Sequence, residues 1–258
     1  MIAGQFLEQG LAIADVEARK VLRDPTELFS RAVQPVLWLV IFGRVFGRVR
    51  GIPTGHLDYT AFLAPGILAQ SILFSSIFYG IGVIWERDLG IVHKLLVSPA
   101  HRSALVLGKA LAAGLRGLAQ AVLIYVLVCL MGIGLRWSPQ ALLGVVLMVA
   151  AASALFSTFS LMIACIVKTR ERFMGIGQLL TMPLFFASNA IYPIALMPGW
   201  LRIAARLNPL TYVTDALRGL MIAGGGSVYG LRLDFAVIAA AFLALTAATS
   251  VLYPTIIR

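Results

Sequence analysis

The chain has 258 residues, of which 60% are hydrophobic and 12% are charged, and its formal net charge is +10. A soluble domain carries about 25% charged residues, so this composition predicts a polytopic membrane protein and excludes an ordinary soluble enzyme. The excess of Lys and Arg is explained by lipid headgroups, where membrane proteins place these side chains, and no nucleic-acid partner is expected. Both cysteines, Cys129 and Cys165, lie in apolar stretches and are interpreted as small apolar side chains.

The N-terminal segment, residues 2–24, has the pattern of an amphipathic helix. Leu7, Leu11 and Ala14 fall on one helical face, and Glu8 and Asp15 fall on another. Such a helix lies in the membrane surface rather than crossing the bilayer. A cap helix that faces the solvent is the alternative.

Six apolar stretches are expected to cross the membrane as helices, which predicts an all-α membrane protein built as one domain. They cover residues 29–47, 59–85, 103–135, 138–167, 173–190 and 233–256. Proline should kink the first span at Pro35 and interrupt the second at Pro65-Gly66. Residues 168–172 are predicted to form a tight basic loop. The outer segment 191–226 mixes arginines with apolar residues around Asn208-Pro209, which predicts two short re-entrant helices before the last span.

An even number of spans places both termini on the same side of the membrane. Lys and Arg are more numerous in the segments on the N-terminal side than in those on the other side. This distribution favours cytoplasmic termini in a cell membrane. The cluster Arg44, Arg48 and Arg50 falls on the outer side and is the main observation against this orientation.

Several chemical motifs are absent from the sequence. Gly108-Lys109 is followed by Ala110, so the chain lacks the glycine-rich phosphate loop and should not bind ATP itself. No His, Cys, Asp or Glu cluster has metal-ligand spacing. The predicted spans contain no carboxylate pair, which argues against a membrane-embedded hydrolase, a transferase and a proton-coupled carrier.

A short charged segment, residues 86–102, separates the second and third spans. Leu89, Val92 and Leu95 recur there at helical spacing, and Ser98-Pro99 ends the helix because the residue before proline avoids the helical region. A short amphipathic helix held between two spans is well placed to be displaced by another protein that binds it.

This charged segment resembles the cytoplasmic loop of ABC exporter permeases of the type-2 class. The similarity extends to NPLTYVTDALR at residues 208–218, which is close to the family's signature before its last span. Gln34-Pro35, Phe42-Gly43 and Leu63-Ala64-Pro65-Gly66 also fit, so the resemblance covers nearly the whole chain. His93 departs from the pattern, because an acidic residue is common there. The residues that match in the charged segment, and that the resemblance assigns to ATPase coupling, are Glu86, Arg87, Asp88, Gly90, Leu95, Leu96, Ser98, Pro99 and Arg102.

The resemblance implies a homodimer of six-span subunits that docks two copies of a separate ABC ATPase. ATP and Mg would bind the ATPase, and no cofactor is expected in this chain. The implied function is ATP-driven export of a hydrophobic or amphipathic substrate, such as a drug, a lipid or a lipid-linked glycan. A secondary carrier or channel that is not driven by ATP is the alternative. Glu86, Arg87 and Asp88 could also simply mark the membrane boundary.

Polar and aromatic residues in or near the spans are candidates for lining a translocation path. Arg116 could meet an anionic headgroup, or it could snorkel to the inner interface or pair with Glu27 or Gln120. The amides could instead hydrogen-bond between helices, and the aromatic residues could belong to the interfacial belt. The candidates are Gln70, Arg116, Gln178, Asn189, Phe185, Phe186 and Tyr212.

Overall fold

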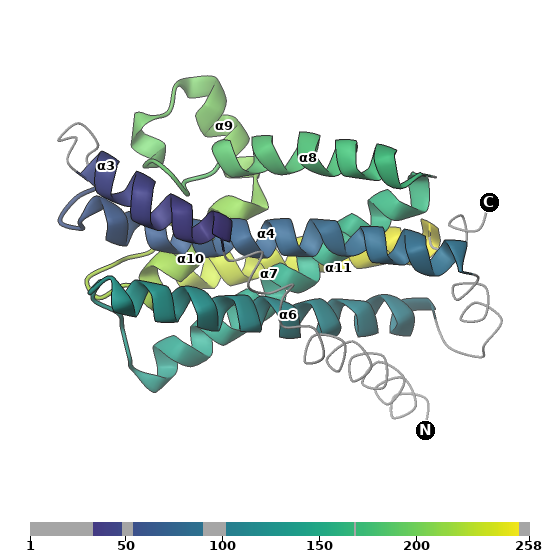
Figure 1. Cartoon of the computed structure of the whole chain (residues 1–258), viewed down its shortest axis with the longest axis horizontal. Coiled ribbons are helices and arrows are strands. Elements are labelled where there is room, and N and C mark those ends of the chain that lie inside the picture. The colour runs from purple at the N-terminus through teal and green to yellow at the C-terminus, as the bar shows by residue number, and fades with distance from the viewer. Residues whose placement is uncertain (1–32, 48–53, 90–101, 168, 253–258) are drawn as a thin grey trace.

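The computed structural model of the chain describes residues 33–47, 54–89, 102–167 and 169–252 (Figure 1). Every regular element in these residues is a helix, and one isolated backbone bridge joins Leu135 to Ile222. The expected all-helical fold is therefore confirmed. Four described helices are long and apolar enough to cross a membrane: α4 (Tyr59–Asp88), Ala110–Leu130 within α6 (Arg102–Leu130), α7 (Pro139–Ile166) and α11 (Leu231–Leu252).

Two further apolar helical segments are shorter. The run Val33–Gly47 contains the π-helical turn η1 (Trp38–Phe42) and ends with α3 (Gly43–Gly47). Helix α8 (Arg170–Phe186) has 17 residues and lies along α4 (Figure 1). Beyond α8 come η2 (Ile194–Leu196), α9 (Gly199–Leu207) and α10 (Pro209–Met221).

The bundle is organised around α4 and α7, which pack against each other along their length. Helix α7 also packs against α6 and α11, and α4 against α8 and α10. Fully buried side chains such as Ile67, Ile72 and Phe156 fill the space between them. Helix α11 is largely exposed, so its apolar surface is available to lipid or to another subunit.

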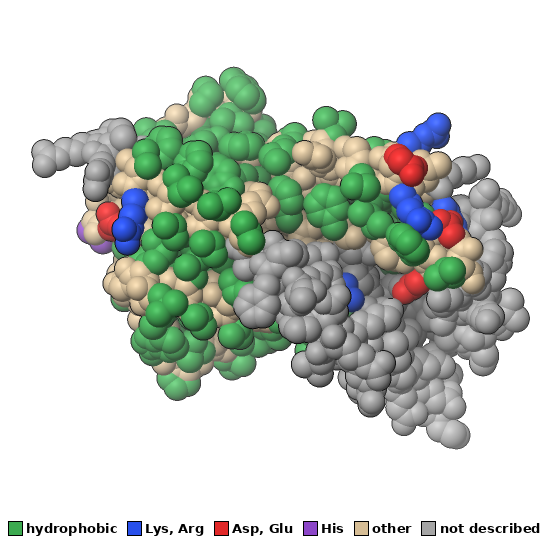
Figure 2. Space-filling model, in the orientation of Figure 1, with side chains coloured by type: hydrophobic (Ala, Val, Ile, Leu, Met, Phe, Trp, Pro, Cys, Tyr) green, Lys and Arg blue, Asp and Glu red, His purple; other side chains and the backbone are tan. Residues whose placement is uncertain are grey.

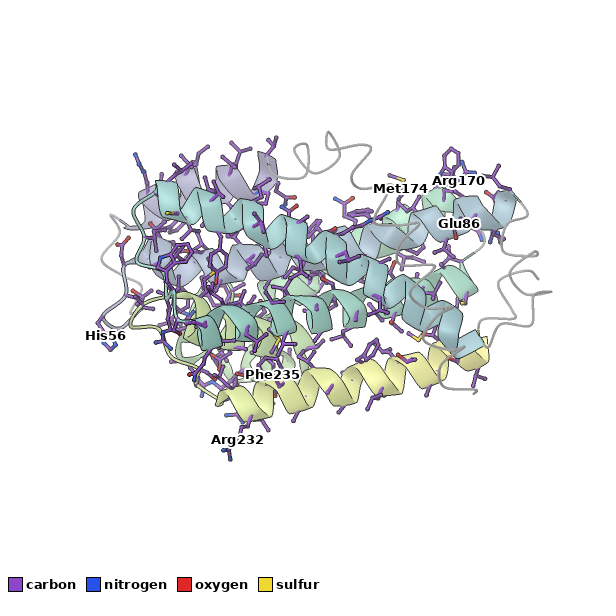
Figure 3. All side chains as sticks on the ribbon, turned by 90° about the horizontal axis from the view of Figure 1, so that it is seen from below. His56, Glu86, Arg170, Met174, Arg232 and Phe235 are labelled. Atoms are coloured by element: carbon purple, nitrogen blue, oxygen red, sulfur yellow. The ribbon has the colours of Figure 1, made fainter. Side chains whose placement is uncertain are left out.

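The described helices end at two opposite ends of the bundle (Figure 1). At one end, the Arg136 N–H donates to the carbonyl of Met221 at 2.9 Å, next to the Leu135–Ile222 bridge. His56 and Arg232 also lie at this end, whereas Glu86 and Arg170 lie at the other (Figure 3). Charged side chains gather near both ends, and hydrophobic side chains cover most of the face between them (Figure 2).

Two predictions about the second and third spans were wrong. Helix α4 is not interrupted at Pro65, and it continues past Trp85 to Asp88. Gly66 has no side chain, and this allows the backbone of Ala190 to approach α4 closely. Helix α6 ends at Leu130 rather than at residue 135, because the chain turns through Gly132 with a φ of 73°.

The predictions around α8 also need correction. Residues Arg170–Arg172 do not form a loop, because Thr169 caps the helix and its hydroxyl accepts a hydrogen bond from the Arg172 N–H at 3.4 Å. Helix α8 ends at Phe186 rather than at residue 190. Its last carbonyls are bound by side chains outside the helix: the Asn208 amide donates to Leu184 at 2.6 Å and to Ala187 at 3.1 Å.

The break between α9 and α10 falls at Asn208, the position predicted from Asn208-Pro209. Asn208 also caps α10, since its Oδ1 accepts from the Leu210 N–H at 3.0 Å. A single side chain therefore holds the end of α8 and the start of α10.

Candidate functional site

A cluster of charged side chains joins the last turn of α4 to the first turn of α8. Asp88 Oδ2 accepts a hydrogen bond from Arg170 Nη2 at 2.9 Å, and Asp88 Oδ1 accepts from Arg87 Nη2 at 3.0 Å. The Arg170 guanidinium carbon lies 3.7 Å from the centroid of the Trp85 ring. The Asp88 and Arg170 side chains are 39% and 35% exposed, so a docking protein can reach both.

This cluster contains part of the predicted coupling segment. Glu86, Arg87 and Asp88 are in the last turn of α4, rather than in a separate amphipathic helix. Arg102 is the first residue of α6. The other predicted coupling residues, Gly90, Leu95, Leu96, Ser98 and Pro99, lie outside the described residues, as does the predicted surface helix at 2–24. Arg170 was not predicted, although its position in a basic segment between two apolar stretches was a usable signal.

The predicted path residues lie in several different places. Gln70 lines a cavity beside α4, whereas Gln178 lies in a shallow groove along α8. Phe185 is fully buried against Trp38 within the subunit, while the neighbouring Phe186 is 44% exposed. Arg116 is half-buried on α6.

The other two path candidates lie near the opposite end of the molecule from Asp88. Asn189 is buried, and its Nδ2 donates to Asp215 Oδ1 at 3.4 Å. The Tyr212 hydroxyl donates to the carbonyl of Arg206 at 2.7 Å, and its ring centroid is 5.2 Å from that of Tyr229. The structure therefore does not gather the seven candidates into one path within a subunit.

A buried acidic pair was missed by the sequence analysis. Asp215 of α10 and Asp234 of α11 are both fully buried. The Ser227 hydroxyl lies between them, 2.8 Å from Asp215 Oδ2 and 2.9 Å from Asp234 Oδ2. The Tyr229 N–H also donates to Asp215 Oδ2 at 2.9 Å. The predicted absence of carboxylate pairs concerned only the predicted spans. Asp215 lies in the predicted outer segment and Asp234 in the last span, so these two acids meet only in the folded chain.

Arg218 brings a buried positive charge to the same end of the bundle. Its Nη2 donates to the carbonyl of Asn189 at 2.7 Å, and its guanidinium carbon lies 3.8 Å from the centroid of the Phe62 ring. These contacts hold α10 against α4 and against the segment after α8. We interpret this polar network as a structural tie, because its contacts join α10 to α4, to α11 and to the segment after α8.

The described residues contain no group of three or more His, Cys, Asp or Glu side chains close enough to share a metal ion. The chemistry that they offer is hydrogen bonding and ion pairing, at the Asp88–Arg170 cluster and in the cavity beside α4.

Comparison with known proteins places the chain in a family. Residues 8–222 match the family described as ABC-2 type transporter. The chain is 30% identical over 200 residues to the transport permease ycf38 of Cyanophora paradoxa, covering 77% of this chain and 69% of that relative. It is 23% identical over 197 residues to the daunorubicin resistance ABC transporter permease protein DrrB1 of Streptomyces coeruleorubidus, with 76% and 69% covered. It is 25% identical over 197 residues to nodulation protein J of Rhizobium leguminosarum bv. trifolii, with 76% and 74% covered. The chain therefore belongs to the ABC-2 type transporter family and is a membrane permease of that type.

Proposed function

We propose that two copies of this chain form the transmembrane part of an ATP-driven exporter, and that each copy docks one separate ATPase subunit that binds ATP and Mg. The observation that carries this proposal is the accessible Asp88–Arg170 ion pair, which ties α4 to α8 beside the segment that resembles the cytoplasmic loop of type-2 exporter permeases. The phosphate-binding motif that ATP hydrolysis needs is absent from the sequence, so the energy must come from a partner.

The docking surface in this proposal is the segment 86–102 together with the interfacial helix at 2–24. A displacement of this segment would pull the end of α4, and the ion pair would carry α8 with it. Helix α4 is also tied to α7, because Ser160 Oγ accepts from the Gly80 N–H at 3.0 Å and donates to the carbonyl of Ile77. A push at Asp88 would therefore reach three helices through contacts that are already formed.

The proposed topology has six spans, with both termini in the cytoplasm and the Asp88 end facing the ATPase. Support comes from the separation of the loops: the segments predicted to lie outside gather at the end that contains His56, opposite Glu86 and Arg170. In this topology α9 and α10 are re-entrant helices in the outer leaflet. Arg202 and Arg206 of α9 would lie at the outer headgroups.

The proposed substrate is a hydrophobic or amphipathic molecule, and a drug is the class that the relatives favour. DrrB1 is named for resistance to daunorubicin, and the similarity to it covers 76% of this chain. Daunorubicin is therefore a reasonable first probe of transport.

Charge reversal at the ion pair tests the proposed coupling. Asp88→Arg and Arg170→Asp should each reduce ATP-driven daunorubicin uptake into inside-out proteoliposomes by at least about tenfold, because like charges separate α4 from α8. The double variant Asp88→Arg/Arg170→Asp restores an attractive pair and should recover much of the uptake. Arg232→Glu, a charge reversal at the opposite end, is the matched control and should transport normally.

Copurification of the ATPase should be measured on the same samples. Full transport by both single variants would contradict the coupling role of the ion pair. Daunorubicin transport by this chain alone, driven by an ion gradient without ATPase or ATP, would contradict the whole proposal in favour of a secondary carrier.

A further inference from the structure

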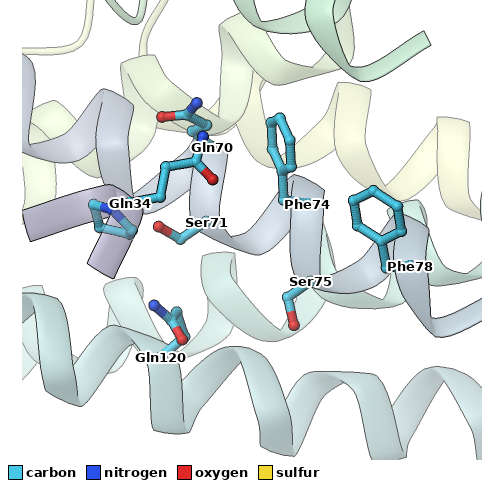
Figure 4. A pocket seen from close by; sticks show the side chains of 8 residues that line it. Gln34, Gln70, Ser71, Phe74, Ser75, Phe78 and Gln120 are labelled. Atoms are coloured by element: carbon cyan, nitrogen blue, oxygen red, sulfur yellow. The ribbon is translucent and has the colours of Figure 1, made fainter. Parts of the chain in front are cut away.

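A cavity lined by carboxamides and phenyl rings lies beside the middle part of α4 (Figure 4). Its volume is about 330 Å³, and it is formed by the helical run 33–47, α4 and α6. Small-molecule sites usually fall between about 300 and 1,000 Å³. The lining residues that matter here are three carboxamides, one hydroxyl and two phenyl rings: Gln34, Gln70, Gln120, Ser71, Phe74 and Phe78.

The carboxamide of Gln120 is buried but lacks a hydrogen-bond partner. The side chain is 2% exposed, and within the described part of the chain no acceptor contacts its Nε2. Ser71, across the cavity, donates its hydroxyl to the carbonyl of Ile67 at 2.8 Å, and its oxygen accepts no hydrogen bond from Gln120 Nε2. A buried amide donor without a partner destabilises the folded protein, so its presence calls for an explanation.

Helix packing does not supply that explanation. Amides in spanning helices usually bond across to a neighbouring helix. Here Gln34, Gln70 and Gln120 converge from three different helices on the same space, and no described hydrogen bond joins any of them to another residue (Figure 4). Polar groups at such a depth are expensive in a bilayer and commonly mark substrate pathways.

The lining also bears on the charge of the ligand. The described residues that line the cavity are all uncharged, which suits an uncharged ligand. Carboxamides donate to oxygen acceptors, and the Phe74 and Phe78 rings offer an apolar surface beside them.

We propose that this cavity binds the uncharged head of an amphipathic ligand, with a carbonyl or hydroxyl oxygen that accepts a hydrogen bond from Gln120 Nε2. The apolar part of the ligand lies against Phe74 and Phe78. This inference rests on the proposed export function, because it concerns the ligand chemistry at one of its predicted path residues, Gln70. Daunorubicin, whose amino group is protonated at neutral pH, is expected to bind this cavity more weakly than an uncharged ligand. The same chemistry is presented by a transported solute and by the ester carbonyls of an uncharged bilayer lipid.

The test is equilibrium binding of Nile red, an uncharged planar dye with a carbonyl group, to the full chain in lipid nanodiscs, after subtraction of empty nanodiscs. Gln120→Leu, which keeps most of the volume and removes the amide, should weaken binding at least tenfold. Gln140→Leu is the matched control: Gln140 is an exposed amide in the first turn of α7, and this variant should bind like the wild type. If Gln120→Leu binds Nile red as tightly as the wild type does, the proposal is overturned. It is also overturned if the wild type binds the cationic dye rhodamine 6G as tightly as Nile red and Gln120→Leu abolishes that binding.

Thermal unfolding of the same samples separates a binding role from a structural one. Gln120→Leu should unfold at the same temperature as the wild type or higher, because it removes a buried donor that has no partner. A clear loss of stability would mean that Gln120 supports the fold, and would overturn the assignment. Competition with dioleoylglycerol distinguishes the sources: strong displacement of Nile red identifies a bilayer lipid as the occupant, and weak displacement identifies a solute.

Binding is measured without the ATPase, so its outcome does not depend on export. Intact Nile red binding in a chain that shows no ATP-driven transport would contradict the export function and leave the cavity assignment standing. The reverse result, transport without this binding, would contradict the cavity alone.

Discussion

Gly66 lies where the backbone of Ala190 crosses α4. A Cβ added at Gly66 would stand 2.7 Å from the Ala190 Cα and would also clash with the Ala190 carbonyl oxygen. Backbone atoms cannot rotate away as a flexible side chain can. The Leu63-Ala64-Pro65-Gly66 motif therefore serves close packing of the segment after α8 against α4, rather than a break in α4.

Gly66→Ala should lower the stability of the protein. Overpacking costs about 1–3 kcal/mol, which exceeds the roughly 1 kcal/mol that alanine gains over glycine in a helix. Gly82→Ala is the matched control in the same helix, because a Cβ there meets nothing within 4 Å. It should leave stability unchanged or raise it. The measurement is thermal unfolding of the purified protein in detergent, and equal unfolding temperatures for the two variants would contradict the packing role of Gly66.

At the scale of secondary-structure elements, Asn208 joins two helices, α8 and α10, that are not consecutive in the chain. Its amide nitrogen binds the last carbonyls of α8, and its amide oxygen caps α10. Proline at position 209 suits the first turn of α10, since the missing N–H has no partner there in any helix. The direction of the chain between α9 and α10 is therefore set by a side chain as well as by the proline.

Asn208 variants should separate these two contributions. Asn208→Ser keeps a good cap for α10 but loses both bonds to α8, whereas Asn208→Ala loses all three. Asn208→Ala should therefore be less stable than Asn208→Ser by about 1 kcal/mol, the usual value of a helix cap. Both should be less stable than the wild type, because the carbonyls of Leu184 and Ala187 lose their donors. Denaturation in detergent measures the differences, and equal stability of Ala and Ser would exclude the capping contribution.

At the scale of the whole molecule, the two ends of the bundle have different roles in the proposed exporter. One end is tied by buried charges, with Asp215, Arg218 and Asp234 bonded within the chain or lying against an aromatic ring. The opposite end carries the accessible Asp88–Arg170 pair. A permease that is pushed from the cytoplasm needs accessible charges at the cytoplasmic end and firm packing elsewhere.

Cysteine labelling should establish which end faces outward. In a background with Cys129 and Cys165 replaced by alanine, His56→Cys should react with a membrane-impermeant maleimide on intact cells. Glu171→Cys, at the α8 end of the ion-pair cluster, should react only after the membrane is permeabilised. The opposite pattern would invert the proposed orientation and would leave the Asp88–Arg170 end unable to meet a cytoplasmic ATPase.

The helical fold and the family could both be predicted from the amino-acid sequence alone. Long apolar stretches in lipid must satisfy every backbone hydrogen bond internally, so they form helices whatever surrounds them. The motifs at residues 86–102 and 208–218 were sufficient to reveal the resemblance to the family, because each motif is a short continuous stretch of sequence. Helix bounds were predicted less well: the expected break at Pro65 is absent from α4, and the helix ends near Gly132 and Arg170 depend on which groups lie alongside.

Which polar groups meet depends on how the helices pack. Asp88 and Arg170 are separated by a large part of the chain, and the same is true of Gln34, Gln70 and Gln120. The period of a helix shows which residues share a face, but it does not show which face packs against which partner. Hydrogen bonds and ion pairs between distant segments form only after the bundle has packed, so the ion pair, the buried acids and the amide cavity could not be read from spacing alone.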